Sequence, residues 1–233
     1  SGGIQQRMGG ISEDNLFLRD PIAVPFGHAE NPANITVPGV IRNNVVLGSR
    51  DIGTAQVQAS GIVINSYAST GTIAENVSVY GNIVAHNELG TGNFKAIYIS
   101  GLLRNVEVYN NIAYDWTVPN WPNPNDHRAH MLRLSVANNS TNTKVHDNIF
   151  QQPNSGFVAT CSNPNPQNVS LYNNTYYSAE ADLGALWSRG WFEIGSAVTS
   201  DEWIRQTGET GMVKQRVSFP DPNRKIETYM AAL

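Results

Sequence analysis

The segment Val77-Ser-Val-Tyr-Gly-Asn-Ile-Val-Ala-His86 recurs along this chain with the same order of residue types. Three further full copies and two weaker ones begin at Val106, Thr143, Val169, Ile11 and Val40. Each full copy alternates apolar and polar residues, then has a polar or turn residue, a fixed Asn and further apolar positions. Because alternation with a period of two sends successive side chains to opposite faces, each copy predicts β-strand and not helix.

The fixed Asn occurs six times, at Asn15, Asn44, Asn82, Asn111, Asn148 and Asn174. The gaps between these positions are 29, 38, 29, 37 and 26 residues. Repeats of this size are typical of solenoids and propellers, in which each unit buries its apolar face against its neighbours. An Asn at the same place in every turn can pass an amide hydrogen bond to the Asn above and below, as in stacked in-register strands.

Two other repeat architectures fit the pattern less well. A leucine-rich repeat needs a Leu-x-x-Leu-x-Leu frame, which this sequence lacks, and a propeller blade needs about 40–45 residues. The chain resembles right-handed parallel β-helix proteins of the pectate-lyase-like type, which carry an internal Asn ladder, over roughly residues 1–195. We therefore expect an all-β fold, a right-handed single-stranded parallel β-helix of about six coils.

Residues 196–233 predict a C-terminal cap and tail with short helices. Ser200 is expected to be the N-cap of one helix that ends before Gly208, and Asp221 is expected to cap another. Such a cap covers the unpaired strand edges at the end of a solenoid. Residues 219–230 also resemble the tail that follows the solenoid in secreted bacterial β-helix proteins, which implies a secreted or extracellular location.

The two ends of the chain suggest a piece of a larger protein. The first residues, Ser1-Gly-Gly-Ile-Gln-Gln-Arg7, have the pattern of a strand in the middle of a coil. The last residues end at Leu233 in a helical pattern without a glycine cap. We expect a fragment or a processed chain, without the N-terminal coils of the solenoid.

Composition narrows the classes of partner. The formal charge is −4 with 15% charged residues and no basic run, which argues against nucleic acid. No apolar run reaches the roughly 18 residues that a membrane span needs. A single cysteine, Cys161, excludes an internal disulfide and leaves the redox compartment open.

A second series of short strands lies between the Asn repeats, at residues 61–65, 96–100, 131–135 and 156–161. Alternation predicts one outer face on which successive coils present Asn65, Tyr98, Ser100, Arg133 and Ser135. The same alternation predicts that Met131, Ala159 and Cys161 also face outward. The Pro-rich connection over residues 118–130 is expected to protrude beside this face and to build a groove wall.

Proteins that resemble this chain often bind acidic polysaccharides in a groove along one parallel sheet, and several cleave them by β-elimination. That chemistry needs a cation on the uronate carboxylate, a base for the C5 proton and an acid for the leaving oxygen. We assign Arg133 to the carboxylate, Lys95 or His130 to the base and Tyr98 to the acid. The expected substrate-binding residues are Asn65, Ser100, Trp121, Asp126, His127 and Ser135.

Two other functions stay open at this point. A glycoside hydrolase of the same fold predicts two carboxylates that face the groove, and the predicted outer columns contain no acid pair. A non-catalytic carbohydrate-binding or structural β-helix, such as an adhesin or spike segment, predicts a face of Asn, Ser and Thr. We expect no cofactor, with Ca²⁺ held by carboxylate oxygens of Asp115, Glu88 and Asp126 as the alternative.

Overall fold

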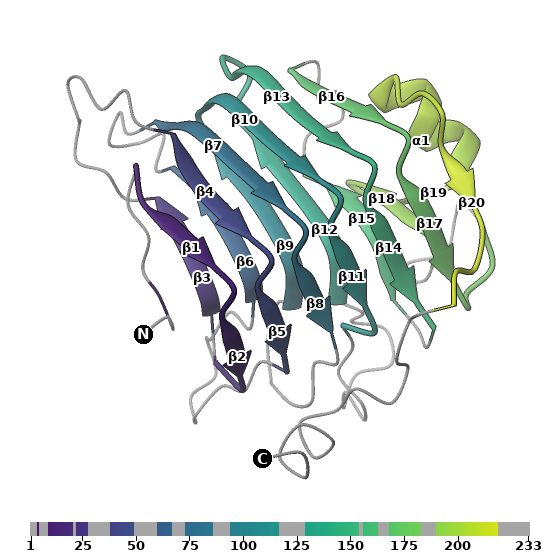
Figure 1. The fold of residues 1–233 in the computed structure, drawn as a ribbon. Coiled ribbons are helices and arrows are strands. Elements are labelled where there is room, and N and C mark those ends of the chain that lie inside the picture. Colours follow the sequence, from purple (N-terminus) through teal and green to yellow (C-terminus); the bar gives the residue numbers. More distant parts are fainter. Residues whose placement is uncertain are drawn as a thin grey trace, which may run out of the picture.

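The structure is a computed structural model that describes residues 4, 9–20, 22–27, 38–48, 60–66, 73–85, 94–116, 129–153, 156–162, 168–182 and 190–218. Within these residues three sheets lie along the molecule, and the chain visits them in rotation (Figure 1). The pairings between the described strands are parallel except the one between the last two strands of the third sheet. The all-β fold expected from the repeats is confirmed, and the arrangement is consistent with a parallel β-helix.

The strands of each sheet stack in the order in which the chain reaches them. Sheet I contains β1 (Ile11–Glu13), β4 (Gly39–Arg42), β7 (Ala74–Tyr80), β10 (Leu103–Tyr109), β13 (Thr141–His146) and β16 (Val169–Tyr172). Sheet II contains β2 (Leu16–Leu18), β5 (Val45–Leu47), β8 (Ile83–Ala85), β11 (Ile112–Tyr114), β14 (Ile149–Gln152), β17 (Thr175–Ser178) and β20 (Val213–Lys214). Sheet III contains β3 (Ile22–Gly27), β6 (Ser60–Asn65), β9 (Phe94–Gly101), β12 (Ala129–Val136), β15 (Phe157–Cys161), β18 (Phe192–Ile194) and β19 (Ala197–Val198).

The apolar positions of the repeats form columns inside the molecule. In sheet I the register places Val79, Val108 and Val145 opposite one another, and all three are fully buried. Burying such a side chain stabilises the fold by about 1.5–3 kcal/mol. Because every coil contributes equivalent positions, one continuous core runs along the described strands.

The residue before each ladder Asn has a left-handed backbone. Its φ lies between 53° and 67° in all six repeats, at Asp14, Asn43, Gly81, Asn110, Asp147 and Asn173. Gly, Asn and Asp adopt this conformation at the smallest steric cost. The chain turns there from sheet I into sheet II, so a residue of this kind followed by Asn marks the corner of each coil.

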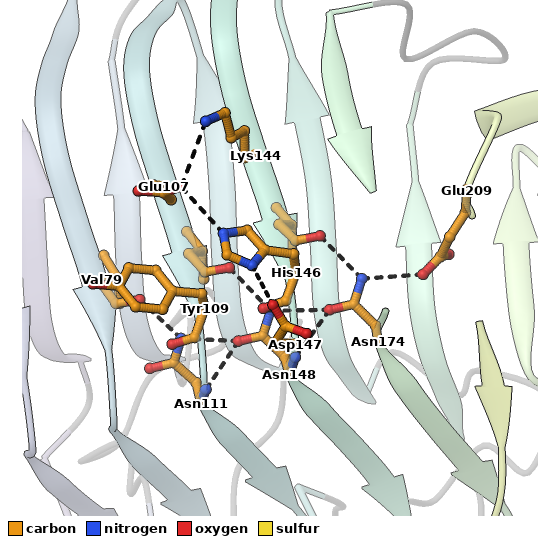
Figure 2. Close-up of polar contacts among 12 residues, drawn as sticks. Val79, Glu107, Tyr109, Asn111, Lys144, His146, Asp147, Asn148, Asn174 and Glu209 are labelled. Atoms are coloured by element: carbon orange, nitrogen blue, oxygen red, sulfur yellow. Dashed lines mark hydrogen bonds and ion pairs between the residues drawn. The ribbon is translucent and has the colours of Figure 1, made fainter. Parts of the chain in front are cut away.

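The asparagines at these corners form the predicted ladder (Figure 2). The side-chain Nδ2 of each Asn donates to Oδ1 of the next one at 2.8–3.0 Å, from Asn15 through to Asn174. The backbone N–H of each also donates to that oxygen, for example from Asn111 to Asn148 at 3.0 Å. From Asn44 to Asn174 each rung therefore satisfies the polar groups of its neighbours in a place that water does not reach.

The ladder ends on a buried carboxylate. Glu209 is 3% exposed and accepts hydrogen bonds from Asn174 Nδ2 at 3.0 Å, from Tyr176 OH at 3.1 Å and from Trp203 Nε1 at 2.7 Å. Trp203 comes from the one helix of the described chain, α1 (Ser200–Thr207), which lies beside the last strands in Figure 1. Glu209 thus supplies the acceptor that the next Asn would have supplied.

The N-cap of α1 differs by one residue from the expected one. Thr199 is the N-cap, and its Oγ1 accepts from the Glu202 N–H at 3.2 Å. The backbone N–H of Ser200 instead donates to Asp182 Oδ1 at 2.8 Å, which ties the start of the helix to the end of the repeats. Gly208 follows the helix with φ 71°, as predicted.

Two further expectations concern residues beyond the repeats. Residues 213–214, placed in the C-terminal cap from the sequence, form β20, which pairs with β17 and extends sheet II. The second predicted helix, from Asp221 on, lies outside the described residues, as does most of the predicted strand at residues 3–7. None of the described helices is long and apolar enough to cross a membrane.

Glu209→Gln is expected to change how stability depends on pH. Burial raises the pKa of Glu209, against the hydrogen bonds from Asn174, Trp203 and Tyr176, which favour the carboxylate. A carboxyl group whose pKa is higher in the folded than in the unfolded protein stabilises the fold at pH values below its unfolded pKa of 4.5. This stabilisation is lost as pH rises through the pKa of the folded protein. Denaturant unfolding from pH 4 upward should show this fall in the wild type and not in the variant. Glu75→Gln, at a partly exposed carboxylate on sheet I, is the control, and parallel curves for Glu209→Gln and wild type would contradict the prediction.

Candidate functional site

The long strands of sheet III each turn two successive residues into the core. The pair is Ala96 and Ile97 in β9, and Met131 and Leu132 fill the same positions in β12. A pair of inward residues shifts the alternation, so that the residues on either side of it both belong to the outer face. This places four predicted site residues together on that face, which are Lys95, Tyr98, His130 and Arg133.

The prediction that Met131, Ala159 and Cys161 face outward was wrong. All three are buried in the core. The register pairs Leu132 with Ala159 and Leu134 with Cys161, so these residues share inward columns. Strict alternation failed because it does not allow two inward residues in a row, and because it was counted from the wrong residue in β15.

Lys95 is a buried cation on this outer face. Its side chain is 3% exposed, and Nζ lies 4.2 Å from the centre of the Tyr98 ring, a cation–π contact. Burial, and secondarily the charge of Arg133, lower the pKa of Lys95 to about 8. A lysine with this pKa is neutral in a substantial fraction of molecules near physiological pH and can accept a proton.

His130 lies opposite Lys95 in the next strand. It is 3% exposed, its ring stacks on Phe157 with 6.0 Å between centroids, and its Nδ1 has no hydrogen-bond partner within the described part of the chain. Burial lowers the pKa of His130 well below 6.5, and the charges of Arg133 and Lys95 act in the same direction. The imidazole is therefore neutral and presents a polar atom that a ligand can bond.

Arg133 lies in the centre of a second outer column. The register places it opposite Tyr98 on one side and Thr160 on the other, and Thr160 is in turn opposite Glu193. Arg133 Nη2 is 3.5 Å from Ser162 Oγ. Burial raises the pKa of Glu193, and the charge of Arg133 counteracts that rise.

The third outer column contains small polar residues. Asn65, Ser100 and Ser135 are opposite one another in β6, β9 and β12. Ser100 Oγ donates to Asn65 Oδ1 at 2.8 Å, and Ser100 is 4% exposed. The structure thus brings together seven of the ten predicted site residues, while Trp121, Asp126 and His127 lie outside the described residues.

Sequence reasoning missed two polar residues of this face, Thr160 and Glu193. Glu193 lies between Phe192 and Ile194, and that alternation in the sequence marks it as outward. Thr160 follows Phe157 by three residues, as Tyr98 follows Lys95 and Arg133 follows His130. The shared spacing of three would have revealed the column.

No metal centre is evident in the described chain. No group of three or more His, Cys, Asp or Glu side chains among the described residues has the arrangement of a metal site. Of the three residues considered for Ca²⁺, the structure describes Asp115, whereas Glu88 and Asp126 lie outside the described residues.

A second polar cluster lies on the outer face of sheet I (Figure 2). His146 stacks between Tyr109 and Tyr172, with centroids 5.3 and 4.4 Å away. Its ring nitrogens lie 2.6 Å from Asp147 Oδ2 and 3.2 Å from Glu107 Oε1. Because the stacked rings cover each other's faces and the carboxylates occupy both nitrogens, this cluster joins neighbouring coils and offers no open ligand position.

Comparison with protein-family models, with curated proteins and with solved structures found no match to this chain. The class of protein is therefore defined by the structure itself. The chain is an all-β protein of parallel sheets whose successive repeats are linked by an Asn ladder, with a partly buried cluster of ionisable side chains on the outer face of sheet III.

Proposed function

We propose that the chain is a pectate-lyase-like right-handed parallel β-helix that is secreted and cleaves a uronate-containing polysaccharide by β-elimination. The polymer lies along the outer face of sheet III. The observation that carries the proposal is the position of Lys95, with a pKa lowered to about 8, on the same face as Arg133, Tyr98 and the neutral His130. A base that is neutral in a substantial fraction of molecules near physiological pH, beside a permanent cation, is what uronate elimination requires.

Each group has a defined part in the reaction. Arg133 binds the uronate carboxylate and stabilises the negative charge that develops when C5 loses its proton. The neutral amine of Lys95 takes that proton, the C4–O bond breaks, and a C4–C5 double bond forms. Tyr98, whose ring touches Lys95 Nζ, gives its phenolic proton to the leaving oxygen. His130 Nδ1 bonds a hydroxyl of the sugar and orients it.

A glycoside hydrolase of the same fold is the nearest rival. Hydrolysis uses two carboxylates on either side of the scissile bond. Glu193 is the one carboxylate in the seven strands of sheet III as the structure describes them. Hydrolysis needs a second carboxylate, which is missing from these strands, so elimination is the better-supported chemistry.

A non-catalytic carbohydrate-binding or structural solenoid is the rival from a different class. The column of Asn65, Ser100 and Ser135 suits such a surface. Burial of Lys95 and His130 on the same face argues against it, because a binding surface gains nothing from lysine and histidine side chains whose charged forms are disfavoured.

Arg133→Ala is expected to abolish formation of the unsaturated uronate product. The variant removes the cation that neutralises the carboxylate, a loss of about 10²–10³-fold or more. The measurement is ultraviolet absorbance of the unsaturated product over a panel of acidic polysaccharides, each with and without Ca²⁺. Arg104→Ala, at an exposed arginine on sheet I, is the matched control and should retain full activity. New reducing ends without ultraviolet absorbance would point to hydrolysis instead, and retention of polymer without cleavage would point to a binding protein.

A further inference from the structure

The outer face of sheet III changes character along the direction in which its strands stack. The two basic residues, Lys95 and the permanent cation Arg133, lie in β9 and β12. The next two strands, β15 and β18, present Phe157, Thr160 and Glu193 at the corresponding positions. Neighbouring strands are about 4.8 Å apart, so a polymer along this face meets the basic residues first and then a stretch with no basic residue in its strands.

Glu193 makes the second stretch unfavourable for a second uronate. It lies in the same column as Arg133, two strands further on, and the two side chains interact electrostatically. Glu193 is partly buried, and charges in such a place are screened less than charges in water. The charge of Arg133 favours the carboxylate form of Glu193. A uronate placed over β15 and β18 would meet this carboxylate, whereas one placed over β12 meets Arg133.

Thr160 offers hydrogen bonding to a sugar hydroxyl in the same stretch. Its side chain is 3% exposed and lies between Arg133 and Glu193, and its Oγ1 has no hydrogen-bond partner among the described residues. A buried hydroxyl without a partner is costly unless a ligand or water bonds it. An uncharged sugar can bond Thr160 and carries no charge for Glu193 to repel.

We propose that this face selects a polysaccharide in which a uronate is linked to an uncharged sugar, with the uronate over β9 and β12 and the uncharged sugar over β15 and β18. Glu193 is then the residue that determines specificity at the second position, through repulsion of a carboxylate. This inference rests on the polysaccharide-cleaving function proposed above and names its substrate class.

The test compares two polymers on the wild type and on Glu193→Gln. One polymer is a homopolymer of a uronate, and the other alternates a uronate with a neutral hexose. The wild type should have the higher kcat/KM on the alternating polymer. Glu193→Gln keeps the shape and removes the charge, and should raise kcat/KM on the homopolymer by about tenfold, with little change on the alternating polymer. Glu75→Gln, on sheet I, should change neither value.

Binding of the same polymers, measured by affinity electrophoresis, separates this inference from the lyase function. Cleavage with equal preference for both polymers, unchanged in Glu193→Gln, overturns the inference and leaves the lyase function standing. Selective retention of the alternating polymer that is relaxed in Glu193→Gln supports the inference even if nothing is cleaved, in which case the lyase function falls. If the polymers are neither cleaved nor selectively retained, both the inference and the lyase function are overturned.

Discussion

Lys95→Met is expected to lower kcat/KM for uronate elimination by about 10²–10⁴-fold, the range that a positioned acid or base contributes. Methionine retains an unbranched, flexible stem that can fill the buried position beside Tyr98, but it has no atom that accepts the C5 proton. Activity is measured by the ultraviolet assay under conditions where substrate is limiting. Lys144→Met, at a half-exposed lysine on sheet I, is the control and should behave as the wild type.

The pH dependence of the wild type identifies which residue is the base. Lys95 must be neutral to accept a proton, and its pKa is about 8, so the rate should rise with pH and level off above about 8. His130 has a pKa well below 6.5, so a rate that depended on it as base would already be level at pH 7. A flat profile between pH 7 and 9 would therefore transfer the role of base from Lys95 to His130.

The repeat could be predicted from sequence because its chemistry restricts residue type at two adjacent positions. A ladder needs the amide of Asn, which is both donor and acceptor, and the corner before it needs Gly, Asn or Asp. The end of the ladder was not predicted. Glu209 has no repeat pattern around it, and only its hydrogen bond from Asn174 Nδ2 in the folded chain shows that it replaces an Asn.

The candidate site could be predicted only in part, for a related reason. Alternation placed Tyr98 and Arg133 on one face, but a buried Lys95 follows no rule of alternation and was found through its charge. The pair of inward residues before Tyr98 breaks the alternation, and the residue types in this strand alone do not reveal it. Glu193 was missed because it lies where the Asn repeat has faded and where two β-strands, β18 and β19, pair antiparallel.

Asn111→Ala is expected to destabilise the fold by about 3–5 kcal/mol, which is a large part of the roughly 5–15 kcal/mol that holds a domain folded. Asn111 is fully buried, and its Nδ2 donates to Val79 O at 2.9 Å and to Asn148 Oδ1 at 3.0 Å. Its Oδ1 accepts from both the backbone N–H and Nδ2 of Asn82. Truncation leaves several of these groups buried without a partner, at about 1–3 kcal/mol each.

Two control variants of the ladder separate hydrogen bonding from packing. Asn111→Leu fills the space without restoring any hydrogen bond, so it should remain nearly as unstable as Asn111→Ala. Asn15→Ala should cost only about 1 kcal/mol, because Asn15 is half-exposed and Asn44 Oδ1 keeps the bond from the Asn15 backbone N–H. Denaturant unfolding of the variants gives these differences. Equal losses at Asn15 and Asn111, or rescue by leucine, would show that the ladder stabilises the coils by filling space and not by its buried hydrogen bonds.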